Sequence, residues 1–496
     1  MLWFNEDAAG SLTARPVDFE SESEGESEMS VVAAQPLPSI ASFDSVFPLP
    51  LTILESFLVL DSRPDYPMHA EVEVELQGRL DPATFQQAVC WALARNPLLT
   101  CRIDRKESGA LAWVPSGKGP AVYWVGLDAP LGDAYARHFD LTTEPGFRIW
   151  VRQTEDRSKI LLQFHHACAD GLGCFGFVED LLAAYAAAVP GGQPVEPRPL
   201  EPERLLHRGE IGIVGRTFWQ QVRDALIGMF EGERFLLQRP MPLAAGASTV
   251  NVELPGGGPA PINGPGFITA TCSEQVTAGL RRAAVQAGGT TNDVLMRDLF
   301  LTLRRWNTER DGTTRRRRLR ILMPQNLRGL DDGRMPAANV MSFAFVTRQA
   351  KLCDSPQKLL HSIRVETEGV KRGLLSLYFI GGLFSLQSLG ILPWLLKRRL
   401  CFATAVLSNL GYPTRRFLTQ FPRSEQGLLA GNLILTGITA SPPLRPHTHA
   451  AFAVMSSDRA ITISLRCDPR TCSSDDARRL LDAYLAQLAA TADSVK

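Results

Sequence analysis

The chain alternates between two hydrophobic periods, and the shorter period predicts its strands. In Ala70–Leu76 aliphatic residues alternate with three glutamates, which is typical of a strand with one buried face and one wet face. Short apolar runs without glycine or proline predict buried strands at Phe147–Val151 and Ile160–Phe164. Further strands are expected at Asn96–Ile103, Leu319–Met323, Val340–Val346 and Ala460–Leu465.

The longer period predicts helices between these strands. Apolar residues recur at helical spacing after Asp81, along Phe175–Tyr185, along Thr291–Trp306 and along Ser473–Leu488. Ser473 and Asp476 have the spacing of a capping box, which fixes the start of the last helix. Strands and helices therefore alternate in both halves, and we expect an α/β protein with mixed sheets flanked by helices.

A chain of 496 residues is too long for one ordinary core, so two subdomains are expected. The segment 186–205 holds five prolines, and 240–266 is rich in glycine, proline and alanine, which favours linkers. The predicted units are a disordered acidic tail (1–45), an N-terminal subdomain (46–200), a linker or crossover with a helix in Ile211–Leu237 (201–266) and a C-terminal subdomain (267–496).

Composition excludes several classes of protein. The 52 basic and 52 acidic residues cancel, whereas a general nucleic-acid binder would carry a basic excess. Nine scattered cysteines without a CxxC pair favour reduced thiols over disulfides or a zinc site. Glu6 and Asp7 stand where an export signal would carry positive charge. We expect a cytoplasmic protein whose partners are small molecules or proteins.

The segment Leu374–Leu396 is apolar and uncharged, and Lys397, Arg398 and Arg399 follow it. It is long enough to cross a bilayer, but Gly381, Gly382, Gln387, Gly390 and Pro393 interrupt it. A buried or tunnel-lining helical hairpin is favoured, and peripheral membrane contact through 374–399 is the next interpretation. Four arginines at 315–318 predict a solvated loop, with a contact to coenzyme A phosphates or acidic lipid as the alternative.

The strongest chemical signal is HHxxxDG, formed by His165, His166, Asp170 and Gly171 between a predicted strand and a predicted helix. A neutral imidazole can take a proton from a hydroxyl or amine and return it to a leaving group. We assign His166 as the base, and His165 then points to the other side of the strand. Gly171 is expected to take a backbone conformation that a residue with Cβ would resist.

The acid of the motif has a predicted structural role. Asp170 is expected to pair with an arginine that holds the turn, and Arg148 and Arg63 are the two candidates. Adjacent strand histidines face opposite sides and no third ligand lies nearby in the sequence, so no metal site is predicted. The C-terminal half weakly repeats the strand–turn–helix pattern, with Arg466 and Cys467 at the histidine positions. One working site per chain is therefore expected.

These residues resemble the chloramphenicol acetyltransferase-like superfamily of thioester-dependent acyltransferases, which includes condensation domains, wax ester synthases and polyketide-associated acyltransferases. The resemblance covers most of 50–490. Besides HHxxxDG it is carried by DSRPDYPMHA (61–70), NPLLTCRI (96–103), TTNDVLMRDLFLTLRR (290–305), LMPQNLRG (322–329), ANVMSF (338–343), LSNLG (407–411) and the terminal LRCDPRTCSSDDARRLLDAYL.

The resemblance implies two subdomains that face each other across an active-site tunnel. An acyl thioester, either acyl-CoA or acyl-phosphopantetheine on a carrier protein, would meet an alcohol or amine at His166. Ser408 stands near the family's oxyanion serine, and a serine that caps a loop is the structural alternative. Asn292 and Asp293 would hold a long helix against the site. No permanently bound cofactor is implied, and a monomer is expected.

Departures from the family pattern leave the reaction open. The chain lacks the DFGWG sequence of the plant acyltransferases and the usual opening motif of condensation domains. The expected activity is O-acylation, as in wax ester or diacylglycerol synthases. The alternatives are a free-standing condensation enzyme that forms an amide and a non-catalytic binding relative. No GxSxG elbow is present, which disfavours a hydrolase.

Overall fold

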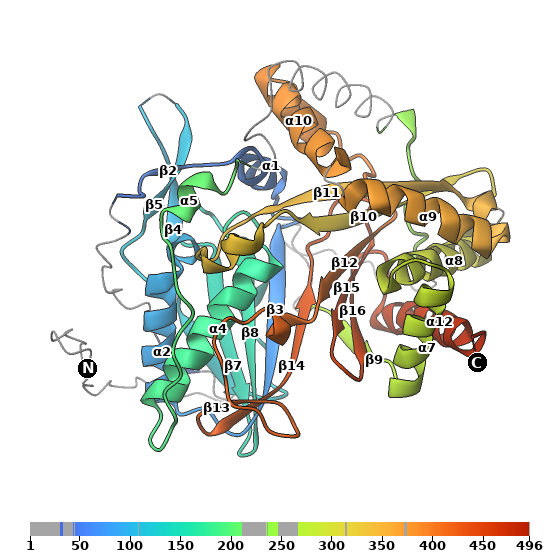
Figure 1. Cartoon of the computed structure of the whole chain (residues 1–496). Coiled ribbons are helices and arrows are strands. Elements are labelled where there is room, and N and C mark those ends of the chain that lie inside the picture. The colour runs from blue at the N-terminus through green and yellow to red at the C-terminus, as the bar shows by residue number, and fades with distance from the viewer. Residues whose placement is uncertain are drawn as a thin grey trace.

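A computed structural model describes residues 30–32, 43, 45–107, 109–210, 235, 237–246, 266–312, 315–371 and 374–495. The predicted acidic tail and the predicted helix at Ile211–Leu237 lie almost wholly outside these residues. The described residues form two helix-flanked sheets that stand side by side (Figure 1).

The first sheet has seven strands in the order β1-β6-β7-β8-β3-β14-β13. Only the β6–β7 pairing is parallel, so the sheet is mixed. Helices α2 and α4 pack side by side over one face (Figure 1). In spatial order the strands are β1 (Ser30–Val32), β6 (Val122–Gly126), β7 (Phe147–Gln153), β8 (Arg157–His165), β3 (His69–Gln77), β14 (Leu433–Ser441) and β13 (Leu428–Ala430), and the helices are α2 (Pro82–Arg95) and α4 (Gly171–Ala188).

The second sheet has six strands in the order β11-β10-β12-β15-β16-β9, and it is also mixed. Helices lie along its outer side (Figure 1). The strands are β11 (Met341–Gln349), β10 (Arg318–Asn326), β12 (Ala405–Gly411), β15 (Ala450–Ser456), β16 (Ile461–Cys467) and β9 (Ile268–Thr271), and the helices are α7 (Glu274–Gln286), α8 (Thr291–Asp311), α9 (Pro356–Lys371) and α12 (Ser474–Asp493). The predicted α/β architecture is confirmed.

Smaller elements complete the described chain. They are the three-stranded sheet of β2 (Leu49–Pro50), β5 (Leu111–Pro115) and β4 (Cys101–Arg105), helices α1 (Ile53–Asp61), α3 (Asp133–Ala136), α5 (Arg204–His207), α10 (Leu374–Ser388) and α11 (Leu392–Lys397), and the 3₁₀ turns η2 (Pro97–Leu99), η3 (Leu330–Arg334), η4 (Ala350–Asp354) and η5 (Pro413–Arg415). The predicted strand at Asn96–Ile103 thus begins as a turn, because Pro97 has no N–H to give a strand ladder.

Helix starts follow their capping residues. The hydroxyl of Ser473 accepts from the N–H of Asp476, and the Asp476 carboxylate accepts from the N–H of Ser473, so the predicted capping box of α12 is confirmed. Asp170 caps α4 in the same way, through the N–H of Gly173 at 2.8 Å. Within the described chain α4 is the one helix whose length and composition suit a membrane span, and 67% of it is buried inside the protein.

Two strands cross the predicted domain boundary. The sequence assigns 267–496 to the C-terminal subdomain, yet β13 and β14 belong to the first sheet, where β14 pairs antiparallel with β3. The reason is that β3 has a free edge on the side away from β8, and β14 satisfies its backbone hydrogen bonds. The boundary drawn from the sequence is therefore corrected at 428–441.

The predicted wet face of β3 is wrong. Glu71 is 2% exposed and Glu73 is 4% exposed, because this face of the sheet looks toward the second subdomain. Their charges are matched: the Arg466 guanidinium lies 2.6 Å from Glu71, and the Lys159 ammonium lies 3.2 Å from Glu73. Alternation marks a face as polar, but only the tertiary structure decides whether that face meets water or a second sheet.

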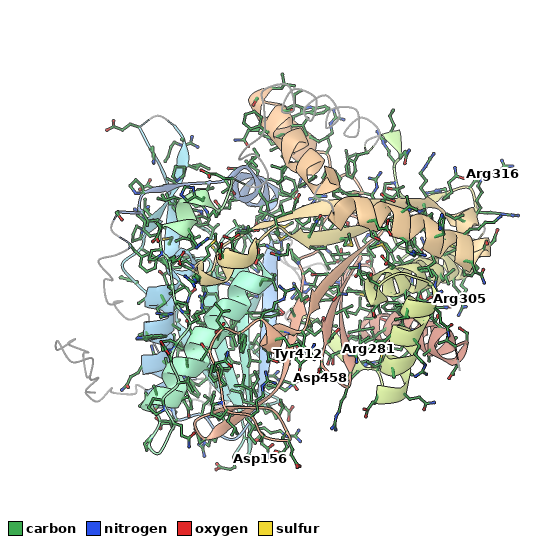
Figure 2. All side chains as sticks on the ribbon, viewed as in Figure 1. Asp156, Arg281, Arg305, Arg316, Tyr412 and Asp458 are labelled. Atoms are coloured by element: carbon green, nitrogen blue, oxygen red, sulfur yellow. The ribbon has the colours of Figure 1, made fainter. Side chains whose placement is uncertain are left out.

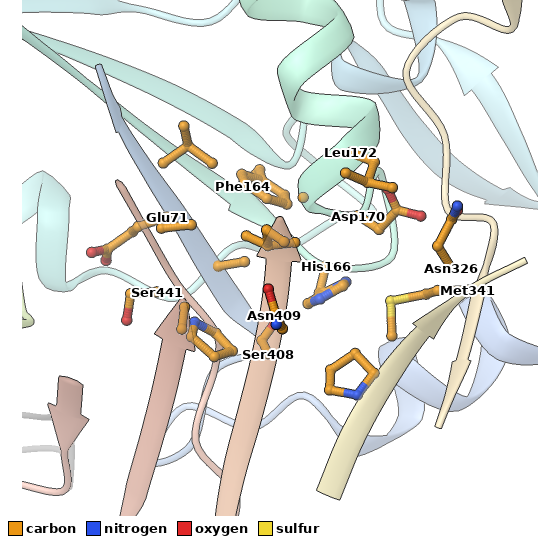
Figure 3. A pocket seen from close by; sticks show the side chains of 18 of the residues that line it. Glu71, Phe164, His166, Asp170, Leu172, Asn326, Met341, Ser408, Asn409 and Ser441 are labelled. Atoms are coloured by element: carbon orange, nitrogen blue, oxygen red, sulfur yellow. The ribbon is translucent and has the colours of Figure 1, made fainter. Parts of the chain in front are cut away.

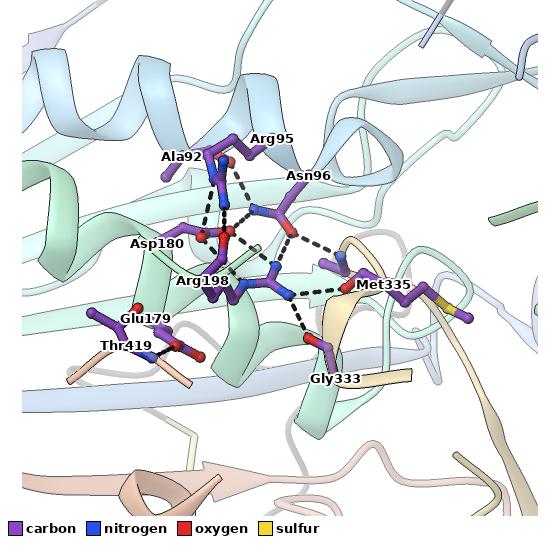
Figure 4. A network of polar contacts seen from close by, with 10 residues as sticks. Ala92, Arg95, Asn96, Glu179, Asp180, Arg198, Gly333, Met335 and Thr419 are labelled. Atoms are coloured by element: carbon purple, nitrogen blue, oxygen red, sulfur yellow. Dashed lines mark hydrogen bonds and ion pairs between the residues drawn. The ribbon is translucent and has the colours of Figure 1, made fainter. Parts of the chain in front are cut away.

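The predicted linker at 186–205 lies against the first subdomain as an ordered strap. Its Arg198 is 3% exposed and bridges three elements (Figure 4). The guanidinium donates to the Asp180 carboxylate on α4 at 3.0 Å, to the side-chain oxygen of Asn96 after α2 at 3.1 Å, and to the carbonyl of Met335 at 3.0 Å. Such a fully paired buried arginine fixes the connection between β10 and β11 on the first subdomain.

Candidate active site

The HHxxxDG segment lies at the predicted strand-to-helix turn. Strand β8 ends at His165, and α4 begins at Gly171. The turn is held from both sides: the N–H of His166 donates to the carbonyl of Met68 at 2.7 Å, and the N–H of Cys168 donates to the carbonyl of His165 at 2.9 Å. The position of both histidines is therefore set by backbone hydrogen bonds rather than by side-chain packing alone.

The two histidines have different surroundings. His165 is 1% exposed, its Nδ1 accepts from the N–H of Ala167 at 3.1 Å, and burial lowers the pKa of His165 to about 3. His166 instead lines a cavity. Its buried Nδ1 has no hydrogen-bond partner on another described residue, which leaves Nε2 as the ring nitrogen that can face the cavity.

Burial lowers the pKa of His166 below its ordinary value, and the hydrogen bond with its own backbone and the nearby Asp170 carboxylate oppose that shift only in part. The imidazole is thus neutral at neutral pH. A neutral ring carries one N–H hydrogen, and when that hydrogen is on Nδ1, Nε2 can accept a proton. A neutral imidazole with one ring nitrogen open to a cavity has the requirements of a general base.

Asp170 pairs with an arginine, as predicted, but neither candidate from the sequence is that arginine. Arg148 pairs with Glu144 at 3.0 Å, and Arg63 donates to the carbonyl of Leu396. The partner is Arg328, whose guanidinium lies 2.7 Å from the Asp170 carboxylate. Arg328 comes from the second subdomain. It lies far from Asp170 in the sequence, so no local pattern predicts this contact.

The Asp170 carboxylate also binds backbone. One oxygen accepts from the N–H of Gly173, and the other accepts from Arg328 and from the N–H of Val340 at 2.9 Å. Burial by itself would raise the pKa of Asp170, but Arg328 and the two N–H groups outweigh it, and the pKa is lowered. Asp170 therefore remains ionised and joins α4 to the loop between β10 and β11.

Asn339 is a site residue that the sequence reasoning missed. It is 2% exposed, and its side-chain amide donates to the carbonyl of His166 at 2.6 Å. The segment ANVMSF was noted for its resemblance, but nothing in its pattern shows that the amide reaches the base. With Arg328 and Val340, Asn339 makes the second subdomain a direct support of the turn.

Gly171 is needed for a different reason than expected. It is the first residue of α4 and is not among the glycines with positive φ. A Cβ added at this position would lie 3.1 Å from the side chain of Leu410, which follows Asn409 in the second subdomain. The glycine thus permits close approach of the two subdomains beside the base.

The cavity at His166 has an empty volume of about 710 Å³, including space open to solvent. Figure 3 shows His166 at its centre, with Asp170 and Leu172 on one side and Glu71 and Ser441 on the other. Both subdomains line it: the first contributes mainly β3 and the turn after β8, and the second contributes β10, β12 and β15.

Ser408 lines this cavity on β12, and among the described residues its hydroxyl has no hydrogen-bond partner (Figure 3). The neighbouring Asn409 donates to the side-chain oxygen of Asn292 at 3.2 Å, which ties β12 to the start of α8. Asp293 caps α8 through Thr290 and accepts from Thr367 at 2.7 Å, so its role is structural.

Ser441 supplies a second unused hydroxyl. It is 2% exposed, lines the cavity, and its oxygen has no hydrogen-bond partner in the described part of the chain. It stands directly opposite Glu71 in the β14–β3 pairing. Within the described ranges no three His, Cys, Asp or Glu side chains are grouped to hold a metal ion. The polar groups that line the cavity thus include the His166 imidazole, hydroxyls, side-chain amides and the exposed guanidinium of Arg416.

Comparison with known proteins shows what this chain is similar to. No protein-family model matches it. Uncharacterized protein Rv2305 of Mycobacterium tuberculosis (strain H37Rv) is 29% identical over 275 residues, which cover 53% of this chain. The match spans 58% of that relative's length. A protein of strain CDC 1551, uncharacterized protein MT2362, matches equally.

Solved structures match over far more of the chain. The first condensation domain of the CDA synthetase has a TM-score of 0.60 at 15% identity, covering 89% of this chain and 95% of that domain. The chain shares the two-subdomain fold of condensation domains. Polyketide synthase associated protein 5 from Mycobacterium tuberculosis has a TM-score of 0.55 at 14% identity, covering 90% and 97% of the two chains. The X-domain from teicoplanin biosynthesis has a TM-score of 0.57 at 17% identity, covering 90% and 95%.

Proposed function

We propose that the protein is an acyltransferase that moves an acyl group from a thioester, acyl-CoA or an acyl carrier protein, to a hydroxyl acceptor. The observation that carries this proposal is His166, a neutral imidazole that lines a cavity between two subdomains. The fold supports it, since one starter condensation domain of this fold is known in complex with C8-CoA.

His166 acts as a general base and then as a general acid. Its Nε2 takes the proton of the acceptor hydroxyl while the acceptor oxygen forms a bond to the thioester carbonyl carbon. The carbon–sulfur bond of the resulting tetrahedral intermediate then breaks, and the imidazolium returns the proton to the departing thiolate sulfur. The products are an ester and a free thiol.

Ser408 is proposed as the donor to the oxyanion of that intermediate. Its hydroxyl lines the same cavity and has no partner among the described residues, so no existing bond must break before it donates. Asn409 holds this part of β12 against α8 through Asn292. The loop that bears Arg328 and Asn339 keeps the turn of His166 in place.

The acceptor class has two candidates. O-acylation, as in wax ester or diacylglycerol synthases, is the first, and amide formation, as in a free-standing condensation enzyme, is the second. The amide candidate is supported by the condensation domains among the solved structures of this fold. A non-catalytic relative is disfavoured by the neutral imidazole of His166 in the wall of the cavity, which a binding role alone does not require.

The purified chain incubated with fatty acyl-CoA and separate panels of alcohols and amines tests the proposal, with products identified by mass spectrometry. Ester with alcohols and little amide with amines is the expected result. His166→Ala should lower the rate by roughly 10²–10⁴-fold, the range of general-base catalysis. His361→Ala, an exposed histidine on α9, is the matched control and should keep full activity. Absence of any acyl product, or full activity in His166→Ala, overturns the assignment.

A further inference from the structure

In the hairpin of α10 and α11, α10 stands out from the body of the protein beyond β11 (Figure 1), and α11 contacts α10 and α1. It corresponds to the predicted apolar hairpin, with a turn at Leu389–Ile391 that breaks the segment into helices of 15 and 6 residues. Neither helix is long enough to cross a bilayer. The favoured interpretation, a buried or tunnel-lining hairpin, is wrong for the outer side of the hairpin, where large apolar side chains meet solvent.

The inner side of the hairpin explains how it is held. Phe379 packs against Phe343 and Phe57 with ring centroids 5.4 and 5.9 Å apart, and Leu383 and Leu392 are buried. A rigid aromatic contact of this kind fixes the helix to β11 and α1. The exposed side is therefore presented by an anchored element rather than by a loose loop.

We give the name apolar tip to the exposed apolar residues of α10, the turn and α11, which are Phe384, Leu389, Ile391, Pro393 and Trp394. The exposed fractions are 65% for Phe384, 68% for Leu389 and 56% for Trp394. No charged residue occurs between 374 and 396. A surface helix normally buries one apolar stripe and shows polar residues on its other side. An apolar outer side therefore indicates a partner that removes it from water.

Charge beside the apolar tip identifies the kind of partner. Lys397 and Arg398 are exposed and have no ion-pair partner among the described residues, while Arg399 pairs with Asp65 at 2.7 Å. The Arg398 guanidinium lies over the Trp394 ring, 4.4 Å from its centroid. Exposed aromatic and aliphatic groups next to unpaired cations match the boundary between acyl chains and anionic headgroups. A tryptophan at that boundary suits the preference of its amphipathic ring.

We propose that the apolar tip, with Lys397 and Arg398, docks the protein on the surface of a membrane that contains anionic lipid. The side chains of the tip enter the region between headgroups and acyl chains, and the two cations contact the headgroups. The helices lie on the bilayer and do not span it. This site is separate from the cavity at His166, because none of its residues lines that cavity.

Co-sedimentation of the full chain with vesicles tests the proposal. One set contains phosphatidylcholine alone, and the other contains about a quarter phosphatidylglycerol, which supplies negative surface charge. We expect binding to the anionic set that weakens as salt is raised, because the headgroup contacts are screened. Lys397→Glu with Arg398→Glu should weaken partitioning by on the order of 30-fold or more, and Phe384→Ser with Trp394→Ser by on the order of 100-fold.

Matched controls exist elsewhere on the described surface. Val285→Ser changes an apolar side chain that is 77% exposed on α7. Arg316→Glu with Arg317→Glu reverses two charges in the other basic run, at the outer edge of the second subdomain (Figure 2). Both controls should sediment like the natural chain. No binding to anionic vesicles, or equal loss in the controls, overturns the proposal. A concentration-dependent dimer that Trp394→Ser abolishes, without vesicle binding, also overturns it.

Discussion

The contacts of the Asp170 carboxylate with Arg328 and with the N–H of Val340 lead to a quantitative prediction. Asp170→Asn keeps the shape of the side chain and one carbonyl oxygen, and asparagine caps a helix about as well as aspartate. The lost oxygen is the one that accepts from Arg328 and from the N–H of Val340. In its place the amide nitrogen would face two donors. The variant thus keeps the cap of α4 and loses the link to the second subdomain.

The expected cost follows from burial. Asp170 is 4% exposed, and the Arg328 side chain is 11% exposed, so solvent screens the pair little. Removing one partner of a buried ion pair costs about 3–5 kcal/mol of unfolding free energy, because the other charge stays buried. We expect Asp170→Asn and Arg328→Met each to lose about that amount, and the double variant to lose clearly less than the sum.

A double-mutant cycle by urea unfolding at pH 7, followed by tryptophan fluorescence, measures this coupling. Additivity of the two single changes to within about 0.5 kcal/mol would refute the reasoning, since that is the behaviour of independent sites. The pH dependence gives a second check. The folded pKa of Asp170 is lowered, so its contribution is present above the ordinary carboxyl pKa of about 3.9 and is lost as pH falls through the folded value. The difference between the natural chain and Asp170→Asn should shrink in that range.

Three further predictions concern the base, the oxyanion donor and the strap. Because burial lowers the pKa of His166, kcat/KM for acyl transfer should keep its plateau as pH falls past 6.5, and a midpoint above 6.5 would contradict the base assignment. Ser408→Ala should lower kcat by about 10²–10³-fold with little change in KM, measured by steady-state kinetics; a loss confined to KM would argue against an oxyanion contact. Arg198→Met should lower the unfolding free energy, measured by urea unfolding, by about 3–5 kcal/mol. Arg204→Met removes a partly exposed pair with Glu201 and should lower it by less than about 1 kcal/mol. Equal losses in the two variants would refute the role of the strap.

The sequence predicted what depends on neighbouring residues. Periodicity located β8 and α4, the capping box placed the start of α12, and the motif placed His166 at a turn with Asp170 beside it. These features are local: a strand has a period of two, a helix has a period of 3.6, and a cap acts within one turn.

Only the tertiary structure decided which residues far apart in the sequence contact each other. It paired Asp170 with Arg328 rather than with Arg148, carried β14 into the first sheet, and buried Glu71 against Arg466. It also showed that Gly171 lies close to the Leu410 side chain and does not have a positive φ. Each of these contacts joins residues far apart in sequence, and a local pattern fixes which side of an element is polar or apolar but not which other element will lie against it.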